Sequence, residues 1–147
     1  MSGIVCAIRG GPNSQAPIAR AIGLAKDSNL PLYFLYVVNL DFLSRTSSSR
    51  VHTISREMRQ MGEFILLTAQ AKSAAEDIPA QGLIRQGNVG QEIVDLCHEL
   101  EADYLVLGRP QVQEEGSVFT QDLLQEFIER TEEQTNAQVV LADGGKA

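Results

Sequence analysis

A glycine, a short polar loop and a second glycine in the last third of the chain have the spacing of an anion-binding site. Gly108 follows the apolar run 104–107, and seven residues separate it from Gly116 and Ser117, where a helix is expected to begin. In a strand, loop and helix arranged this way, backbone N–H groups and the positive end of the helix dipole face a negatively charged ligand. The pattern therefore predicts an anion pocket.

The elements that would position this pocket follow from five apolar runs alternating with four helical segments. Strands are expected at residues 4–8, 30–38, 83–85, 104–107 and 139–142. Helical periodicity fills the intervals 14–29, 51–69, 88–100 and 117–128. This alternation is typical of an α/β fold, a doubly wound parallel sheet with helices on both faces. Ligands bind such sheets at the carboxyl ends of the strands, which points to the loops at Arg9 and Gly108.

Three local patterns are specific enough to be checked. The apolar positions of the second helix step by three and four along one face, and we expect that face to be core: Val51, Ile54, Met58, Met61, Ile65 and Ala69. Asn88 is expected to cap the third helix, with Gln91 able to reach back to it. The two cysteines, Cys6 and Cys97, are expected to be buried, reduced thiols.

Bulk properties narrow the class of protein. A chain of 147 residues suggests one domain, residues 1–147. The net charge of −7 argues against nucleic acid or an anionic membrane as a partner. No apolar run is long enough to span a bilayer, and the first residues lead straight into a strand without a leader pattern, so we expect a soluble, cytoplasmic protein. Cys97 and His98 are adjacent and cannot face each other on a helix, and no zinc spacing is present, so no catalytic or metal-binding residue is expected.

Two segments resemble the universal stress protein (UspA-like) family. Residues 87–93 read GNVGQEI and residues 101–108 read EADYLVLG, similar to the family's G-D-P-x-x-x-I and A-D-L-I-V-x-G. The first strand, the first helix and the run 35–38 resemble the family's opening as well. The resemblance implies a five-stranded sheet of order 3-2-1-4-5, an adenine nucleotide alpha hydrolase-like fold. It also implies a dimer, in a family of which one branch binds ATP with Mg²⁺ and another does not.

The ATP-binding branch has the pattern G-x2-G-x9-G-[S/T], which this chain keeps only in part. Gly108 matches the first glycine, the second falls on Gln111, and Gly116 with Ser117 matches the end. The seven residues between Gly108 and Gly116 stand where the family pattern has twelve. The family's aspartate after strand one, which contacts the adenosine part of the nucleotide, falls on Arg9. Carried over to this chain, the resemblance implies nucleotide contacts at Arg9, Val38, Gly108, Arg109, Gly116 and Ser117.

These departures weaken the case for a bound triphosphate. A shorter loop offers fewer N–H donors, and Gln111 adds a Cβ where close approach favours glycine. Glu114 and Glu115 place negative charge beside the phosphate path, where like charges repel by about 1 kcal/mol at 4 Å even in water.

Two functions remain open. The first is a non-enzymatic stress-response module without a cofactor, a dimer that contacts other proteins. The second is an adenine-nucleotide (ATP or AMP) switch with at most slow hydrolysis. A related possibility is a different anion between Arg9 and Arg109.

The last strand is expected to form the dimer. In the order 3-2-1-4-5 it lies at an edge, and residues 138–142, QVVLA, contain no charge or proline to protect that edge. Pairing with the same strand of a second copy would satisfy the backbone and bury the aliphatic side chains.

Overall fold

In the part of the chain that the structure describes, five parallel strands form the centre of the molecule. The computed structural model describes residues 3–9, 15–38, 48–108 and 121–142. The strands are β1 (Ile4–Ala7), β2 (Leu32–Val38), β3 (Ala80–Gln86), β4 (Tyr104–Gly108) and β5 (Gln138–Ala142). Their order is β3-β2-β1-β4-β5, and every neighbouring pair is parallel. The predicted doubly wound sheet and its strand order are confirmed.

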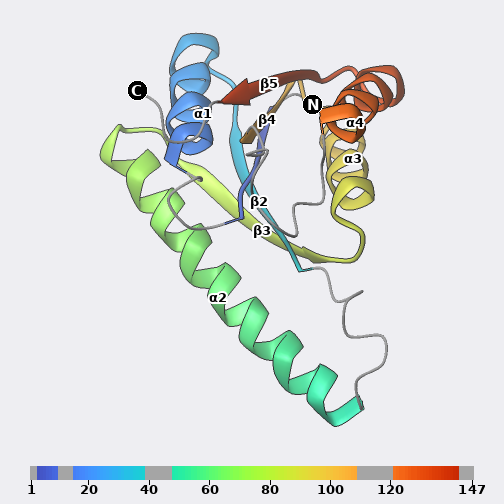
Figure 1. The fold of residues 1–147 in the computed structure, drawn as a ribbon. Helices are drawn as coiled ribbons and strands as arrows, with labels where there is room; N and C mark the ends of the chain where they lie inside the picture. Colours follow the sequence, from blue (N-terminus) through green and yellow to red (C-terminus); the bar gives the residue numbers. More distant parts are fainter. Residues whose placement is uncertain (1–2, 10–14, 39–47, 109–120, 143–147) are drawn as a thin grey trace.

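Within the described residues four helices cover the sheet, two on each face, and Figure 1 shows their arrangement. They are α1 (Gln15–Ser28), α2 (Ser48–Ala75), α3 (Val89–Leu100) and α4 (Gln121–Gln134). The helices α1 and α2 pack on one face, and α3 and α4 on the other. Within the described ranges, no helix is long and apolar enough to cross a membrane.

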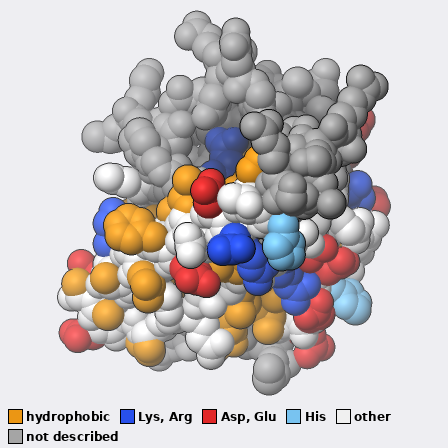
Figure 2. Space-filling model, turned by 90° about the horizontal axis from the view of Figure 1, so that it is seen from below, with side chains coloured by type: hydrophobic (Ala, Val, Ile, Leu, Met, Phe, Trp, Pro, Cys, Tyr) orange, Lys and Arg blue, Asp and Glu red, His pale blue; other side chains and the backbone are white. Residues whose placement is uncertain are grey.

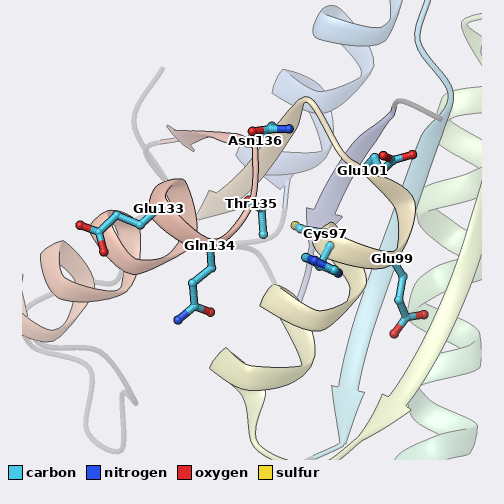
Figure 3. Close-up of a pocket in the computed structure, with 8 residues that line it drawn as sticks. Cys97, Glu99, Glu101, Glu133, Gln134, Thr135 and Asn136 are labelled. Atoms are coloured by element: carbon cyan, nitrogen blue, oxygen red, sulfur yellow. The ribbon is translucent and has the colours of Figure 1, made fainter.

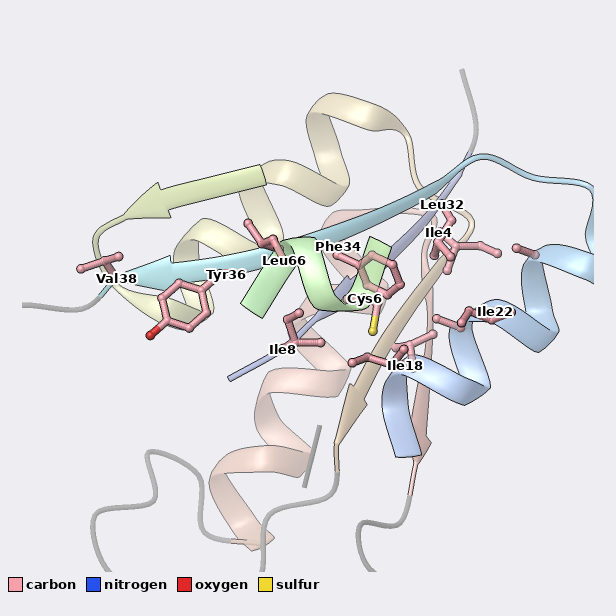
Figure 4. Packing of buried hydrophobic residues seen from close by; sticks show 14 residues of the cluster. Ile4, Cys6, Ile8, Ile18, Ile22, Leu32, Phe34, Tyr36, Val38 and Leu66 are labelled. Carbon is pink, nitrogen blue, oxygen red and sulfur yellow. The ribbon is translucent and has the colours of Figure 1, made fainter. Parts of the chain in front are cut away.

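The core consists of two layers separated by the sheet, because successive side chains of a strand point to opposite faces. Cys6 pairs with Phe34 on one side and with Val106 on the other, and all three side chains face α1 and α2. Their neighbours Val5 and Leu105 face α3 and α4. Figure 4 shows Phe34 and Cys6 gathered with Ile18 between the sheet and α1. Strands buried on both faces explain the continuous apolar runs in the sequence.

The predicted apolar face of α2 is partly wrong. Met61 is 58% exposed, whereas Leu66 is 4% exposed and Ala69 is fully buried. The buried stripe passes through Gly62, Leu66, Ala69 and Ser73, which step by four, three and four. Gly62 and Ser73 carry no apolar side chain, so a pattern of large apolar residues could not reveal this stripe.

Two elements are longer than predicted. β3 spans Ala80–Gln86 rather than residues 83–85, and it pairs with β2 along its whole length. Its added residues are alanine, glycine and glutamine, which do not favour a strand by themselves, so pairing with β2 decides their conformation. α2 begins at Ser48 rather than Val51 and takes up two residues of the serine-rich run.

The start of α3 follows the prediction in one of two respects. Asn88 is the N-cap, and its Oδ1 accepts a hydrogen bond from the Gln91 backbone N–H at 3.0 Å. The Gln91 side chain does not reach back to the cap. Its Nε2 donates forward to Asp95 Oδ1 at 2.8 Å, a pair one helical turn apart.

Two glycines within helices allow a matched test of the packing of α2 on β2. A Cβ at Gly62 would lie 2.5 Å from Tyr36 Cδ2, whereas a Cβ at Gly23 in α1 would meet nothing within 4 Å. Gly23→Ala should therefore raise the free energy of unfolding by up to about 1 kcal/mol, the usual gain in helix propensity. Gly62→Ala should lower it by about 1–3 kcal/mol, because Tyr36 is buried and cannot move aside easily. Urea unfolding measures both, and equal stability of the two variants would contradict the close packing of α2 on Tyr36.

Candidate functional site

The carboxyl ends of β1 and β4 form the point where the strand order reverses. After β1 the chain forms β2 on one side of it, and later in the sequence it forms β4 on the other side of β1. Such a reversal leaves a crevice in which ligands of doubly wound sheets bind. Of the predicted residues, Arg9 lies two residues after the end of β1, and Gly108 is the last residue of β4, so the fold brings these two to neighbouring strand ends.

The chain around Arg9 changes from core to surface within two residues. The Ile8 backbone N–H donates to the Leu35 carbonyl at 2.9 Å, which extends the contact with β2 past the end of β1. Ile8 is 4% exposed, while Arg9 is exposed. An arginine side chain donates hydrogen bonds and accepts none. The point where the strand order reverses therefore has a positive charge near the end of its central strand.

Val38 lies at the carboxyl end of β2, separated from β4 by β1. Its side chain is fully buried in the core shared with α1 and α2. Its carbonyl accepts a hydrogen bond from the Gly87 N–H at 3.0 Å. Gly87 has φ of 150°, and a Cβ there would lie 2.8 Å from Glu92 Oε2, so this turn requires glycine.

Three of the predicted residues, Arg109, Gly116 and Ser117, lie outside the described residues. The structure therefore places Arg9, Val38 and Gly108 of the predicted set. Gln111, Glu114 and Glu115 belong to the same loop.

Arg85 of β3, which no sequence pattern singles out, is held by carboxylates of α3. Its Nη2 lies 2.6 Å from Glu99 Oε1 and its Nη1 3.0 Å from Glu99 Oε2, a bidentate pair. Glu92 Oε1 lies 3.7 Å from Arg85 Nη1. The Glu99 carboxylate raises the pKa of the Arg85 guanidinium. Arg85 thus links β3 to α3. Sequence spacing alone could not reveal a contact between residues 14 positions apart on a strand and a helix.

The two thiols are buried and free, as predicted. Burial raises the pKa of both, that of Cys97 to about 12, and the Cys6 Sγ lies 3.6 Å from the Pro17 carbonyl. Thiolate is the reactive form of cysteine, so this burial disfavours both side chains as nucleophiles at neutral pH. His98 is exposed while Cys97 is buried, so the two do not form a catalytic pair.

A pocket of about 500 Å³ lies where α3 and α4 end. Figure 3 shows Cys97 and Thr135 in its middle, with the carboxylates of Glu99 and Glu133 pointing to opposite sides. Among the described residues, no group of three or more His, Cys, Asp or Glu side chains is placed to hold a metal ion. None of the predicted site residues lines this pocket.

Comparison with known proteins decides the family. The sequence model of the universal stress protein family matches residues 1–128 of this chain. The chain belongs to the universal stress protein family. A comparison with curated protein sequences gave no significant match.

Solved universal stress proteins share the fold at low sequence identity. UspA from Lactobacillus plantarum aligns with a TM-score of 0.77 and 16% identity, covering 96% of this chain and 97% of that one. A universal stress protein from Archaeoglobus fulgidus in complex with dAMP has a TM-score of 0.64 and 16% identity, covering 97% and 98%. Another, in complex with cAMP, has a TM-score of 0.69 and 18% identity, covering 95% of each chain. These likenesses extend over nearly the whole chain and establish the shared fold.

Proposed function

We propose that this chain is a non-enzymatic stress-response module that works in the cytoplasm as a homodimer, contacts other proteins and does not bind ATP in the ordinary way. The observation that carries the proposal is Arg9, exposed at the carboxyl end of the central strand. The family resemblance assigns that position to an aspartate that contacts adenosine. A carboxylate accepts hydrogen bonds, whereas a guanidinium only donates them, so Arg9 cannot take over that contact.

The sequence of the following loop supports the same proposal. It is shorter than the family pattern and carries Glu114 and Glu115 where a triphosphate would need positive charge or backbone N–H groups. Arg85 does not compensate, because Glu99 already forms a bidentate ion pair with it.

Isothermal titration with Mg-ATP is expected to give no saturable heat at micromolar protein. The physical reason is the combined loss of the adenosine acceptor at Arg9 and of phosphate donors in the loop after Gly108. Titration with MgCl₂ alone corrects for the heat of the metal. A one-to-one isotherm with low-micromolar affinity would overturn the proposal.

A second candidate function, an adenine-nucleotide switch with at most slow hydrolysis, is favoured by the solved relatives that are in complex with dAMP and cAMP. A monophosphate requires fewer phosphate contacts than ATP. In this chain it would lie between Arg9, Arg109 and Ser117, which precedes α4 in the sequence, with Val38, Gly108 and Gly116 around it.

If AMP binds, Arg9→Ala is expected to weaken binding by about 1.5–3 kcal/mol, the range for a hydrogen bond to a charged group. Arg20→Ala is the matched control, because Arg20 is an exposed arginine on α1. Titration calorimetry with AMP measures both variants. An affinity that Arg9→Ala leaves unchanged would place the nucleotide elsewhere.

The dimer contact of the first proposal is supported by a difference between the two edges of the sheet. The edge strand β3 contains Arg85, a charge that discourages pairing, whereas β5 contains none. Gln138 N–H donates to the Asp103 carbonyl of the preceding segment, so the N–H groups of Val139 and Leu141 point away from β4. Val139, Val140 and Leu141 are only half-buried. A second copy of β5 would cover these side chains and pair with this backbone.

A further inference from the structure

The outward face of α2 carries large apolar side chains that nothing in the described structure covers. Met61 is 58% exposed, Phe64 72% and Leu67 64%, and they are the exposed large hydrophobic residues of the described part of the chain. All three lie within two turns of one helix, and Figure 2 shows hydrophobic side chains gathered at one side of the lower face, next to charged side chains. Clustered exposure of this kind marks an interaction surface.

The geometry of α2 defines the stripe. Gly62, Leu66, Ala69 and Ser73 face the sheet, so at about 100° per residue Phe64 points directly away from it. The same outward face continues with Gln60, Thr68, Ala71 and Ala75, all exposed and uncharged. We call the face formed by Gln60, Met61, Phe64, Leu67, Thr68 and Ala71 the α2 stripe. It follows one side of a helix that Figure 1 shows as long and straight, which suits another helix rather than a small molecule.

The charges at its two ends indicate that the other helix is a second copy of α2. Glu57 lies seven residues before Phe64 and Lys72 eight residues after it, about 10 and 12 Å along the helix axis. If two α2 helices cross antiparallel with Phe64 against Phe64, Glu57 of each copy comes beside Lys72 of the other. In the part of the chain that the structure describes, neither residue forms an ion pair within its own copy.

We propose that the α2 stripe is a two-fold contact between copies of this chain, an antiparallel helix pair centred on Phe64. The contact is isologous, with each apolar side chain packing on the same stripe of the other copy. Its apolar patch is small against the roughly 800 Å² per partner of a standard interface, so the association is weak and concentration-dependent. It is separate from β5, and a chain that uses both contacts joins dimers into larger assemblies.

The test uses Val140→Lys protein, in which the proposed strand contact is absent, so that its outcome does not depend on that contact. Sedimentation velocity should show this protein pairing reversibly as its concentration rises to hundreds of micromolar. Adding Phe64→Lys should weaken the pairing at least about tenfold, the effect of a central contact residue. Adding Gln81→Lys instead, the same new charge on an exposed residue of β3, should leave it unchanged.

Charge reversal tests the register. Glu57→Lys and Lys72→Glu should each weaken pairing, because each places like charges side by side, and the two together in one chain should restore it. A Val140→Lys protein that stays at 16.0 kDa at every concentration would overturn the proposal. So would a Phe64→Lys protein that pairs as before, which would leave the stripe to a different partner. A double charge reversal no better than the single ones would disprove the antiparallel arrangement.

Discussion

Val140→Lys is expected to convert a dimer of about twice 16.0 kDa into a monomer. Val140 lies in the middle of β5, the edge strand without charge or proline, and its side chain is half-buried against the sheet core. A lysine at this position places a charge in the strand contact, where a second copy would have to bury it. Light scattering at tens of micromolar protein measures the mass, and circular dichroism checks that the helical signal is retained.

Gln81→Lys is the control for this prediction, since it places the same charge on the opposite edge strand and should leave the dimer intact. A wild-type chain that is monomeric at tens of micromolar, or a Val140→Lys protein that stays dimeric, would show that β5 is not the contact.

A substitution of Glu132 is expected to have the opposite effect on the dimer, which it should tighten. Its Oε2 accepts a hydrogen bond at 3.1 Å from the Val139 N–H, one of the groups that β5 would offer to a second copy. Pairing through β5 must therefore displace this carboxylate. Glu132→Ala should tighten the dimer about tenfold or more, because a hydrogen bond to a charged group no longer competes.

Phe34→Ala should lower the free energy of unfolding by about 3–5 kcal/mol, the usual cost of removing a buried phenylalanine side chain. Phe34 is fully buried in β2 among residues of β1, α1 and α2, so the neighbouring elements can close the cavity only in part. For a domain of ordinary stability this is a large share of the total. Urea unfolding at a fixed protein concentration measures the change.

Phe64→Ala is the matched control, since it removes the same side chain from a position that is 72% exposed. Its stability should change by less than about 1 kcal/mol, as is usual at exposed positions. Similar losses in the two variants would mean that Phe34 is not the central core residue that the structure shows.

Strands buried on both faces could be predicted from the sequence. The length of the edge strand β3 and the buried face of α2 could not. The runs that became β1 and β4 are continuous and apolar, because helices cover both sides of them. β3 is an edge strand with glutamine, glycine and arginine, and only its pairing with β2 shows its full length. On α2, the spacing of apolar residues wrongly predicted that Met61 lies in the core. Gly62 and Ser73 face the sheet instead, and neither has an apolar side chain that would reveal this from the sequence.

The candidate site could be predicted as a location but not as a set of contacts. Strand order and the two loops placed Arg9 and Gly108 together, because parallel strands end at the same edge of the sheet. The burial of Val38 and the use of its carbonyl by Gly87 depend on the path of the chain after β3. The ion pair of Arg85 with Glu99 depends on how α3 lies against β3, which no local pattern encodes.

The central position of β1 has a consequence for the order of events during synthesis. β1 is made first, and β2 can pair with one side of it early, but its other side pairs with β4, about a hundred residues later. Gly3 and Asp103, which are also a hundred residues apart in the sequence, are joined by two hydrogen bonds. The Gly3 N–H donates to the Asp103 carboxylate, and the Asp103 N–H donates to the Gly3 carbonyl. At about 5–20 residues per second the ribosome needs roughly 5–20 s to reach β4. Until then one side of the nascent first strand is open to other chains, and the strand ends that carry Arg9 and Gly108 have not yet come together.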